Sequence, residues 1–194
     1  MTDKDRFGRR VFFQPVQSWL GTSRPVHLND GEAPKRIADL KAFAIDACAV
    51  TTKRFEAFVV ATGYATTAEK AGWSFVFRGF VLNNASGEIA GISNDAQWWV
   101  AVRGASWKHP FGAGSSPDGL ENYPVTHVSQ DDARAMAQWT GGRLPDEAEW
   151  EHAARGGVDD RRYPWGDEEP DDSTVFCNIW QGQFPHTNTM TDGY

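Results

Sequence analysis

The chain has 194 residues and a formal net charge of −7 at pH 7. This acidic balance excludes a general nucleic-acid-binding protein, which needs a basic face to displace counterions. No apolar run approaches the roughly 20 residues of a membrane helix. The 12 Phe, 9 Trp and 4 Tyr residues are enough to build a core. Because the charged N-terminus lacks the apolar stretch of a secretory signal, we expect a soluble, cytoplasmic protein of one domain.

The first predicted helix runs over about Thr52–Thr62. Its buried face is indicated by the i, i+3, i+4 spacing of Phe55, Phe58 and Val59. A threonine at the start of this segment, Thr51 or Thr52 itself, is a good N-cap because its hydroxyl accepts from a backbone N–H of the first turn.

Four short strands are predicted between and around the helices, at Leu40–Ile45, Phe75–Phe77, Trp99–Val102 and Val125–Val128. The tryptophans stand near Gly, Pro and Asn rather than in helical stripes. This pattern favours an α+β fold that is poor in regular secondary structure and held together by large aromatic side chains.

Two further helices are predicted in the second half of the chain. One begins at Ser129 and carries Met136 and Trp139 on one face. The other spans Asp146–Arg155, where an acidic cap and a glutamate three residues later have the capping-box spacing. We expect the apolar face of this last helix to bury Trp150.

The polar residues give only weak signals for catalysis. His109 and His127 have no Ser or Cys nucleophile in a recognisable motif, so we interpret them as hydrogen-bonded structural groups rather than as catalysts. The acidic run Asp167–Asp172 lacks the spacing and the central glycine of an EF-hand loop and is interpreted as a solvated loop. Cys48 and Cys177 are interpreted as packed thiols. No zinc spacing, phosphate loop or dinucleotide-binding turn occurs.

Several motifs together carry a family resemblance. Residues 122–129 read Asn-Tyr-Pro-Val-Thr-His-Val-Ser, residues 142–157 read Gly-Arg-Leu-Pro-Asp-Glu-Ala-Glu-Trp-Glu-His-Ala-Ala-Arg-Gly-Gly, and residues 178–185 read Asn-Ile-Trp-Gln-Gly-Gln-Phe-Pro. With these motifs in this order, the chain resembles the sulfatase-modifying factor family from about residue 20 to residue 194. We therefore divide it into a lead-in, residues 1–19, and a family domain, residues 20–194.

The resemblance implies a fold and an activity. The fold is α+β and C-type-lectin-like, with structural calcium. Active members oxidise a cysteine in a Cys-x-Pro-x-Arg motif of a sulfatase polypeptide to Cα-formylglycine, with O2 and with Cu(I) held by two cysteines. The sulfatase is therefore the expected partner, and neither nucleic acid nor a membrane is expected. The oligomeric state stays open.

The resemblance also implies site residues. The substrate peptide would lie along a groove with wall residues Trp73, Ser74, Trp98, Trp107 and His109.

A structural calcium site is expected at two turns near the end of the chain. Spacing alone favours Asn and Asp side chains that cap the backbone, but the resemblance assigns calcium ligands at Asn178, Ile179, Asp192 and Tyr194. Calcium accepts this mixture of carboxylate, amide and carbonyl oxygens.

The sequence also departs from the family pattern. Ala137 and Ala154 replace disulfide cysteines of secreted members, which suits a reducing, bacterial cytoplasm. Neither Cys48 nor Cys177 matches the copper-binding pair, and the segments expected to carry that pair follow the match to residue 194. The chain thus resembles the N-terminal two-thirds of a family domain, and we expect no catalytic residue within it and no copper binding by it.

Three hypotheses follow. The first is a formylglycine-generating oxidase whose catalytic cysteine segment lies outside these residues. The second is a non-catalytic, C-type-lectin-like binding module of the same family. The third, a subdomain of a non-haem iron sulfoxide synthase, requires a His-rich helical bundle upstream, for which the first 20 residues leave no room.

Overall fold

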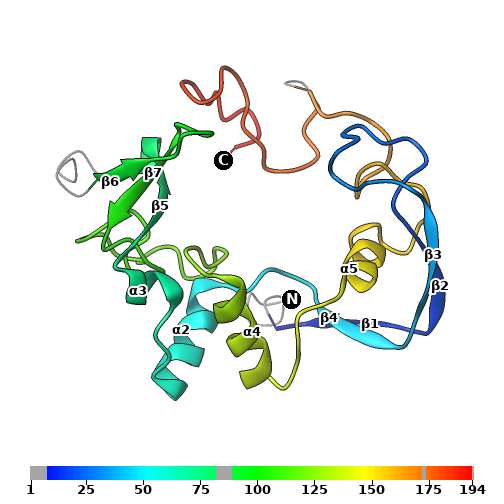
Figure 1. Cartoon of the computed structure of the whole chain (residues 1–194), viewed down its shortest axis with the longest axis horizontal. Coiled ribbons are helices and arrows are strands. Elements are labelled where there is room, and N and C mark those ends of the chain that lie inside the picture. The colour runs from blue at the N-terminus through cyan, green and yellow to red at the C-terminus, as the bar shows by residue number, and fades with distance from the viewer. Residues whose placement is uncertain (1–7, 82–88, 172–173, 194) are drawn as a thin grey trace. The chain divides into compact units, whose positions relative to one another are not determined.

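A computed structural model describes residues 8–81, 89–171 and 174–193 of the chain. The chain forms two compact units (Figure 1). Unit 1 comprises Met1–Val11 and Asp46–Leu144, and unit 2 comprises Phe12–Ile45 and Pro145–Tyr194. Each unit is described by itself.

The first helix of unit 1, α2, spans Thr52–Thr62 as predicted. Thr51 is its N-cap and accepts a hydrogen bond from the backbone N–H of Arg54. Gly63 ends the helix with a φ of 67°, a left-handed conformation that a residue without Cβ adopts at little cost. Local capping chemistry therefore determines both ends of this helix.

Two more helices belong to unit 1. Helix α4, Gln130–Trp139, starts at Ser129 as predicted, and Ser129 and Asp132 form a reciprocal capping box. The short helix α3, Thr67–Ala71, was not predicted from the sequence. Its five residues are too few to show a hydrophobic period, but the capping box of Thr66 and Glu69 and the C-cap Gly72 are local signals that the prediction missed.

The sheet of unit 1 contains β5 (Trp73–Phe77), β6 (Ile89–Ile92) and β7 (Trp99–Arg103) in the order β5-β7-β6. Both pairings are antiparallel, and a short 3-10 turn, η1 (Arg78–Phe80), follows β5. The predicted strands at Phe75–Phe77 and Trp99–Val102 are thus confirmed as parts of β5 and β7, two paired strands of this sheet.

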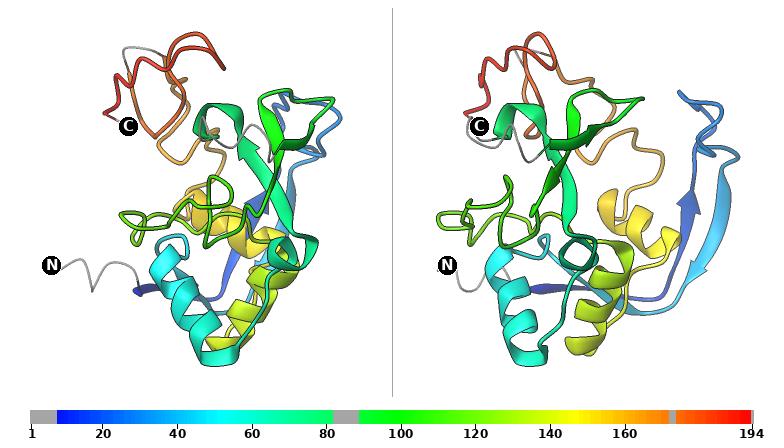
Figure 2. Two further views of the ribbon diagram at one scale, coloured as in Figure 1. Left: turned by 90° about the vertical axis from the view of Figure 1, so that its left-hand side faces the viewer. Right: turned by 60° about the vertical axis from the view of Figure 1, so that its left-hand side comes forward.

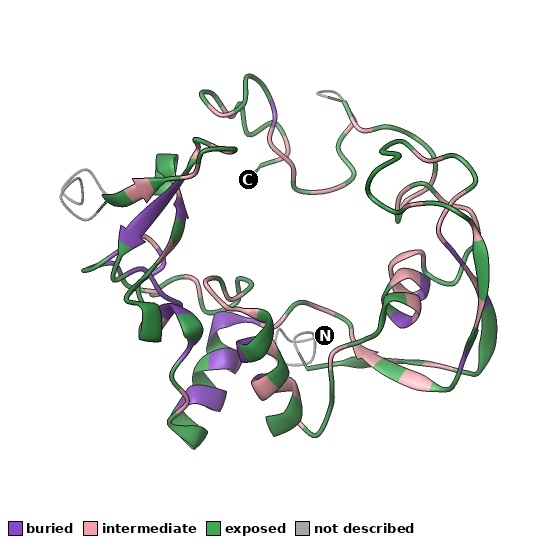
Figure 3. Cartoon of the chain, viewed as in Figure 1, coloured by how far each residue is buried: buried purple, intermediate pink, exposed green. Residues whose placement is uncertain are grey.

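The core of unit 1 consists of two clusters. One joins α2 to α4 through Phe55, Phe58, Val59, Trp107 and Met136, and Figure 2 shows these two helices next to each other. The other lies on one face of the sheet and consists of Val76, Val100, Val102 and Ala105. Figure 3 shows this burial on β7 and α2.

Unit 2 is built on an antiparallel ladder of β2 (Val16–Leu20) and β3 (Arg36–Leu40). Helix α5, Glu147–Ala154, packs against both strands, and a second two-stranded sheet pairs β1 (Arg10–Phe13) with β4 (Phe43–Asp46).

Helix α5 has the predicted ends, but the face that it buries differs from the predicted one. The capping box of Asp146 and Glu149 is present. Trp150, however, is 61% exposed, whereas Glu149 and His152 are buried. The prediction that this helix buries Trp150 is therefore wrong, because the helix meets the β2–β3 ladder through a polar residue instead of its largest apolar one.

Two strand predictions also need correction. The segment Leu40–Ile45 is not one strand, because β3 ends at Leu40 and β4 begins at Phe43. Val125–Val128 is not a strand at all, because His127 has a φ of 59°. A left-handed residue interrupts an extended ladder. Alternation of apolar and polar residues could not reveal this backbone conformation.

The mixture of helices and small antiparallel sheets agrees with the predicted α+β class. None of the helices in the described ranges is long and apolar enough to cross a membrane.

Candidate functional site

The five predicted substrate-binding residues all belong to unit 1. Trp73 and Ser74 open strand β5, Trp98 immediately precedes β7, and Trp107 and His109 lie in the loop that follows β7. The structure therefore places all of them on the sheet or on the loops at its strand ends.

A pocket of about 770 Å³ opens in unit 1 beside β5. Two of the predicted residues, Ser74 and Trp107, line it, whereas Trp73, Trp98 and His109 are not among the lining residues. Most of the lining is apolar and comes from β5, the loop after β7 and residues 117–127. Its aromatic members are Phe75, Phe77, Phe80, Trp99, Trp107, Phe111 and Tyr123.

His127 supplies the main polar contact at this pocket. Its Nε2 lies 2.9 Å from the carbonyl oxygen of Pro110, and its Nδ1 lies 2.9 Å from Ser74 Oγ. Because a carbonyl oxygen only accepts, Nε2 carries the proton and Nδ1 accepts from the Ser74 hydroxyl. The pocket therefore contains a Ser–His pair whose tautomer is set by a backbone carbonyl.

The charge state of His127 supports this assignment. Burial lowers its pKa below the ordinary value of 6.5, and the hydrogen bond to Pro110 opposes that shift only in part. The ring is thus neutral at pH 7 and accepts a hydrogen bond from the hydroxyl of Ser74. Ser74 Oγ consequently offers only acceptor capacity to a ligand.

Trp107 lines the same pocket, but its indole Nε1 is buried. Its side chain is 4% exposed, and no acceptor within the described ranges is in hydrogen-bond reach of its Nε1. Buried indole N–H groups normally have a partner. The pocket wall is largely apolar, with a few hydroxyl groups that include that of Ser74.

Sequence reasoning interpreted His127 as a hydrogen-bonded structural group, and two hydrogen bonds of its ring are present in the structure. It did not find the link to Ser74, which is 53 residues away in the chain. No local spacing signals such a pair, because it is made by folding the loop before α4 onto β5.

His109 is also a hydrogen-bonded group. Its Nδ1 lies 2.6 Å from the carbonyl oxygen of Ser115, a contact within its own loop. It fixes loop geometry, as the sequence interpretation expected.

The predicted calcium ligands lie in unit 2. Asn178, Ile179 and Asp192 are described, whereas Tyr194 lies outside the described residues. The two turns are neighbours, because the backbone N–H of Asp192 donates to Gln181 Oε1 at 2.9 Å. One carboxylate oxygen of Asp192, Oδ2, is buried. This contact brings Asp192 close to Gln181; no contact between Asp192 and either Asn178 or Ile179 is seen among the described residues.

Each unit contains one cysteine and therefore no cysteine pair of its own. Cys48 belongs to unit 1 and Cys177 to unit 2, and both are free cysteines. Cu(I) is selected by paired soft thiolates. The described residues also contain no cluster of three or more His, Cys, Asp or Glu that could hold a metal ion.

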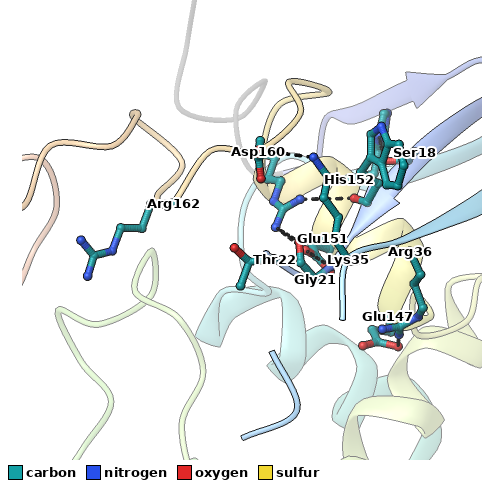
Figure 4. Close-up of polar contacts among 12 residues, drawn as sticks. Ser18, Gly21, Thr22, Lys35, Arg36, Glu147, Glu151, His152, Asp160 and Arg162 are labelled. Atoms are coloured by element: carbon teal, nitrogen blue, oxygen red, sulfur yellow. Dashed lines mark hydrogen bonds and ion pairs between the residues drawn. The ribbon is translucent and has the colours of Figure 1, made fainter. Parts of the chain in front are cut away.

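A cluster of polar contacts surrounds α5 (Figure 4). Ser18 Oγ lies 2.8 Å from His152 Nδ1, and both residues are buried. Arg36 forms an ion pair with Glu147 at 2.6 Å. These contacts join α5 to β2 and β3. Because they satisfy one another, we interpret the cluster as the attachment of α5 rather than a ligand site.

Comparison with known proteins adds independent information. A family model for the sulfatase-modifying factor enzyme 1-like domain matches residues 11–194. The chain is 52% identical over 165 residues to the formylglycine-generating enzyme of Streptomyces coelicolor, which covers 85% of this chain and 52% of that one. It is 46% identical over 175 residues to the enzyme of Bos taurus, covering 90% and 47% of the two chains.

A relative described as inactive is also similar. The inactive C-alpha-formylglycine-generating enzyme 2 of Bos taurus is 43% identical over 175 residues, covering 90% of this chain and 57% of that one. By sequence and by the extent of the match, the chain belongs to the sulfatase-modifying factor family. It spans about half the length of the formylglycine-generating enzymes that it matches.

Proposed function

We propose that this chain is part of a formylglycine-generating oxidase domain, which converts the cysteine of a Cys-x-Pro-x-Arg motif in a sulfatase to Cα-formylglycine with O2. The observation that carries the proposal is the identity of 52% to the Streptomyces coelicolor enzyme, against 43% to the inactive relative of Bos taurus. The catalytic cysteine segment lies outside these residues in this proposal.

The substrate would contact Trp73, Ser74, Trp98, Trp107 and His109. Their position on β5 and on the loops at the ends of β7 supports a binding surface in unit 1. No residue of this chain is assigned a catalytic role.

Two metals belong to the proposal. Calcium would be held in unit 2 by oxygens of Asn178, Ile179, Asp192 and Tyr194 and would cross-link two turns. Copper, bound as Cu(I) by a cysteine pair in the complete domain, would activate O2. The cysteines of this chain do not fit that group, so we assign it no copper ligand.

We also propose a C-type-lectin-like arrangement of the domain and a cytoplasmic location. The free thiols of Cys48 and Cys177 support a reducing compartment, as do the alanines at positions 137 and 154.

A chimera tests the function. In the Streptomyces coelicolor enzyme, this chain would replace the matched stretch, and the purified protein would be incubated with Cu(I), O2 and a Cys-x-Pro-x-Arg peptide. We expect mass spectrometry to detect the aldehyde product. The 194-residue chain alone should yield none, because it lacks the paired thiolates.

The control distinguishes the alternative, a non-catalytic binding module. A second chimera would carry the corresponding stretch of the inactive Bos taurus relative. If the chimera with this chain folds and binds copper but yields no aldehyde above that control, the oxidase proposal is wrong and the binding module is favoured.

A further inference from the structure

Ser74, His127 and Pro110 form a short chain of hydrogen bonds at the pocket of unit 1. Ser74 lies on β5, His127 lies in the loop before α4, and all three residues line the pocket. His127 has a φ of 59°, a conformation that costs free energy at a residue other than glycine. The fold accepts this cost at the residue whose ring meets the hydroxyl of Ser74.

The direction of these hydrogen bonds is fixed at the Pro110 end. The carbonyl oxygen of Pro110 only accepts, so the neutral ring carries its proton on Nε2, and Nδ1 accepts from the hydroxyl of Ser74. The single hydrogen of this hydroxyl is thus used within the protein, whereas Oγ keeps its lone pairs. Any ligand atom that bonds to Ser74 Oγ must therefore bring a hydrogen of its own.

Protonation of His127 reverses this polarity. Both nitrogens of the cationic ring donate, so Nδ1–H would bond to a lone pair of Ser74 Oγ and the hydroxyl hydrogen would turn toward the pocket. An N–H of a ligand would then meet a hydroxyl hydrogen and a nearby positive charge. The same hydroxyl would thus change from an acceptor into a donor.

We propose that His127 is a positioning residue of the substrate pocket, which keeps the Ser74 hydroxyl as an acceptor for a backbone N–H of the substrate peptide and weakens peptide binding when the ring is protonated. The inference rests on the proposed function, which supplies the peptide as the occupant.

The composition of the pocket favours a backbone N–H over the guanidinium of the substrate arginine. No Asp or Glu is among the described residues that line the pocket. A guanidinium would lose its hydration there without a counter-charge, which is costly. A backbone N–H is neutral, and every residue of the peptide except proline carries one.

No other described group of the pocket titrates in mild acid. Only His127 and Tyr123 among the described lining residues are ionisable, and phenols ionise in alkaline solution. The ionisable side chains of the adjoining segments have other partners: Arg54 pairs with Asp46, Glu69 with Lys108 and Asp131 with Arg134, while Asp132 accepts from the N–H of Thr67 and His109 bonds to the carbonyl of Ser115. Burial lowers the pKa of His127 below 6.5, so the reversal belongs to the mildly acidic range.

Nitrogen NMR of the 194-residue chain with labelled histidine tests the geometry without a ligand. We expect the neutral ring of His127 to carry its proton on Nε2, and Nδ1 to become protonated only below pH 6.5. The variant His127→Asn identifies the resonances, because they disappear from its spectrum. A neutral ring with the proton on Nδ1 would overturn the proposal, because Ser74 would then keep its hydrogen for a ligand.

Peptide binding tests the consequence. The chimera with the Streptomyces coelicolor enzyme supplies a complete family domain, and the probe is an acetylated and amidated Ser-Ala-Pro-Ala-Arg peptide. Its serine replaces the oxidisable cysteine, and none of its groups titrates between pH 5 and 7.5. We expect calorimetry to show a Kd about 2- to 12-fold higher at pH 5 than at pH 7.5, the value of one hydrogen bond.

Two variants separate the hydroxyl from the charge of the ring. Ser74→Ala should bind about 2- to 12-fold more weakly than the parent at pH 7.5 and show no further loss at pH 5. Asparagine tolerates a left-handed backbone and offers a non-titrating acceptor to Ser74, so His127→Asn should bind equally well at both pH values. His186→Asn, at an exposed position, is the control and should keep the acid loss of the parent.

The same loss of binding in acid by the parent and by Ser74→Ala would overturn the proposal, because the charge of the ring and not the hydroxyl would then be responsible. An undiminished acid loss in His127→Asn would contradict it as well, because another group would then titrate.

The outcome is separable from that of the oxidase proposal. Acid-sensitive binding that depends on Ser74, without aldehyde from the cysteine peptide, supports the positioning role and rejects the catalytic function. Aldehyde formation with equal binding at both pH values rejects the positioning role alone. No binding at either pH rejects the peptide as the occupant of the pocket and the positioning role with it.

Discussion

At the scale of single residues, His127 is the most informative group. It has a left-handed backbone, a buried ring and two hydrogen-bond partners from different segments. A left-handed backbone conformation at a residue other than glycine costs free energy. His127 adopts it where the loop before α4 meets β5. Its neutral form orients the hydroxyl of Ser74, so its protonation has consequences for the pocket.

Acid should destabilise the protein partly through His127. The unfolded state protonates near the ordinary pKa of 6.5, whereas burial keeps the folded pKa lower. Between these two pKa values the unfolded state binds more protons than the folded state. The free energy of unfolding therefore has its full value above pH 6.5 and falls as the pH decreases below it. Urea unfolding between pH 5 and 7.5 should show this slope.

The variant His127→Gln should reduce that slope, because glutamine does not titrate. His186→Gln, at an exposed position, is the matched control and should keep the slope of the parent protein. If both variants show the slope of the parent, His127 does not contribute to the acid sensitivity.

At the scale of elements, capping and packing determine different features of a helix. Thr51, Ser129 and Asp146 each accept from a backbone N–H of the first turn of their helix. These contacts determine where a helix begins. They do not determine which face is buried, and α5 shows the difference because it presents His152 rather than Trp150 to its sheet.

His152→Ala should destabilise the protein more than Trp150→Ala. The first change leaves the buried hydroxyl of Ser18 without its partner and removes the edge contact with the Phe13 ring, so we expect a loss of about 2–4 kcal/mol. Trp150 is 61% exposed, and its removal should cost at most about 1 kcal/mol.

Chemical denaturation of both variants compares these costs. Ser18→Ala combined with His152→Ala completes a double-mutant cycle, and the pair should show coupling because the two residues are in contact. A larger loss for Trp150→Ala than for His152→Ala would restore the originally predicted helix face.

At the scale of the whole molecule, the chain forms two compact units. Unit 1 carries the pocket. Unit 2 carries long irregular segments, including residues 178–193, in which few strands or helices provide stability. An ion that joins two turns is a physically effective way to stabilise such a segment.

Calcium should therefore raise the melting temperature. A ligand that binds only the folded state stabilises it by about 2.7 kcal/mol at a hundredfold excess over its Kd. Magnesium should do less because it demands a tighter octahedron. Asp192→Ala should abolish the calcium shift, whereas Asp167→Ala should not. An equal shift in the parent protein and in Asp192→Ala would place the ion elsewhere, with the acidic run Asp167–Asp172 as the first candidate.

The sequence by itself determined the family, the acidic net charge and the ends of three helices. The helix ends are encoded locally, because capping residues and glycines act over three or four neighbouring positions. The sequence also indicated β5 and β7, two paired strands of the sheet of unit 1. Only the tertiary structure decided the buried face of α5, the left-handed turn at His127 and its bond to Ser74. Each of these depends on segments far apart in the chain, and no local pattern encodes which of them meet.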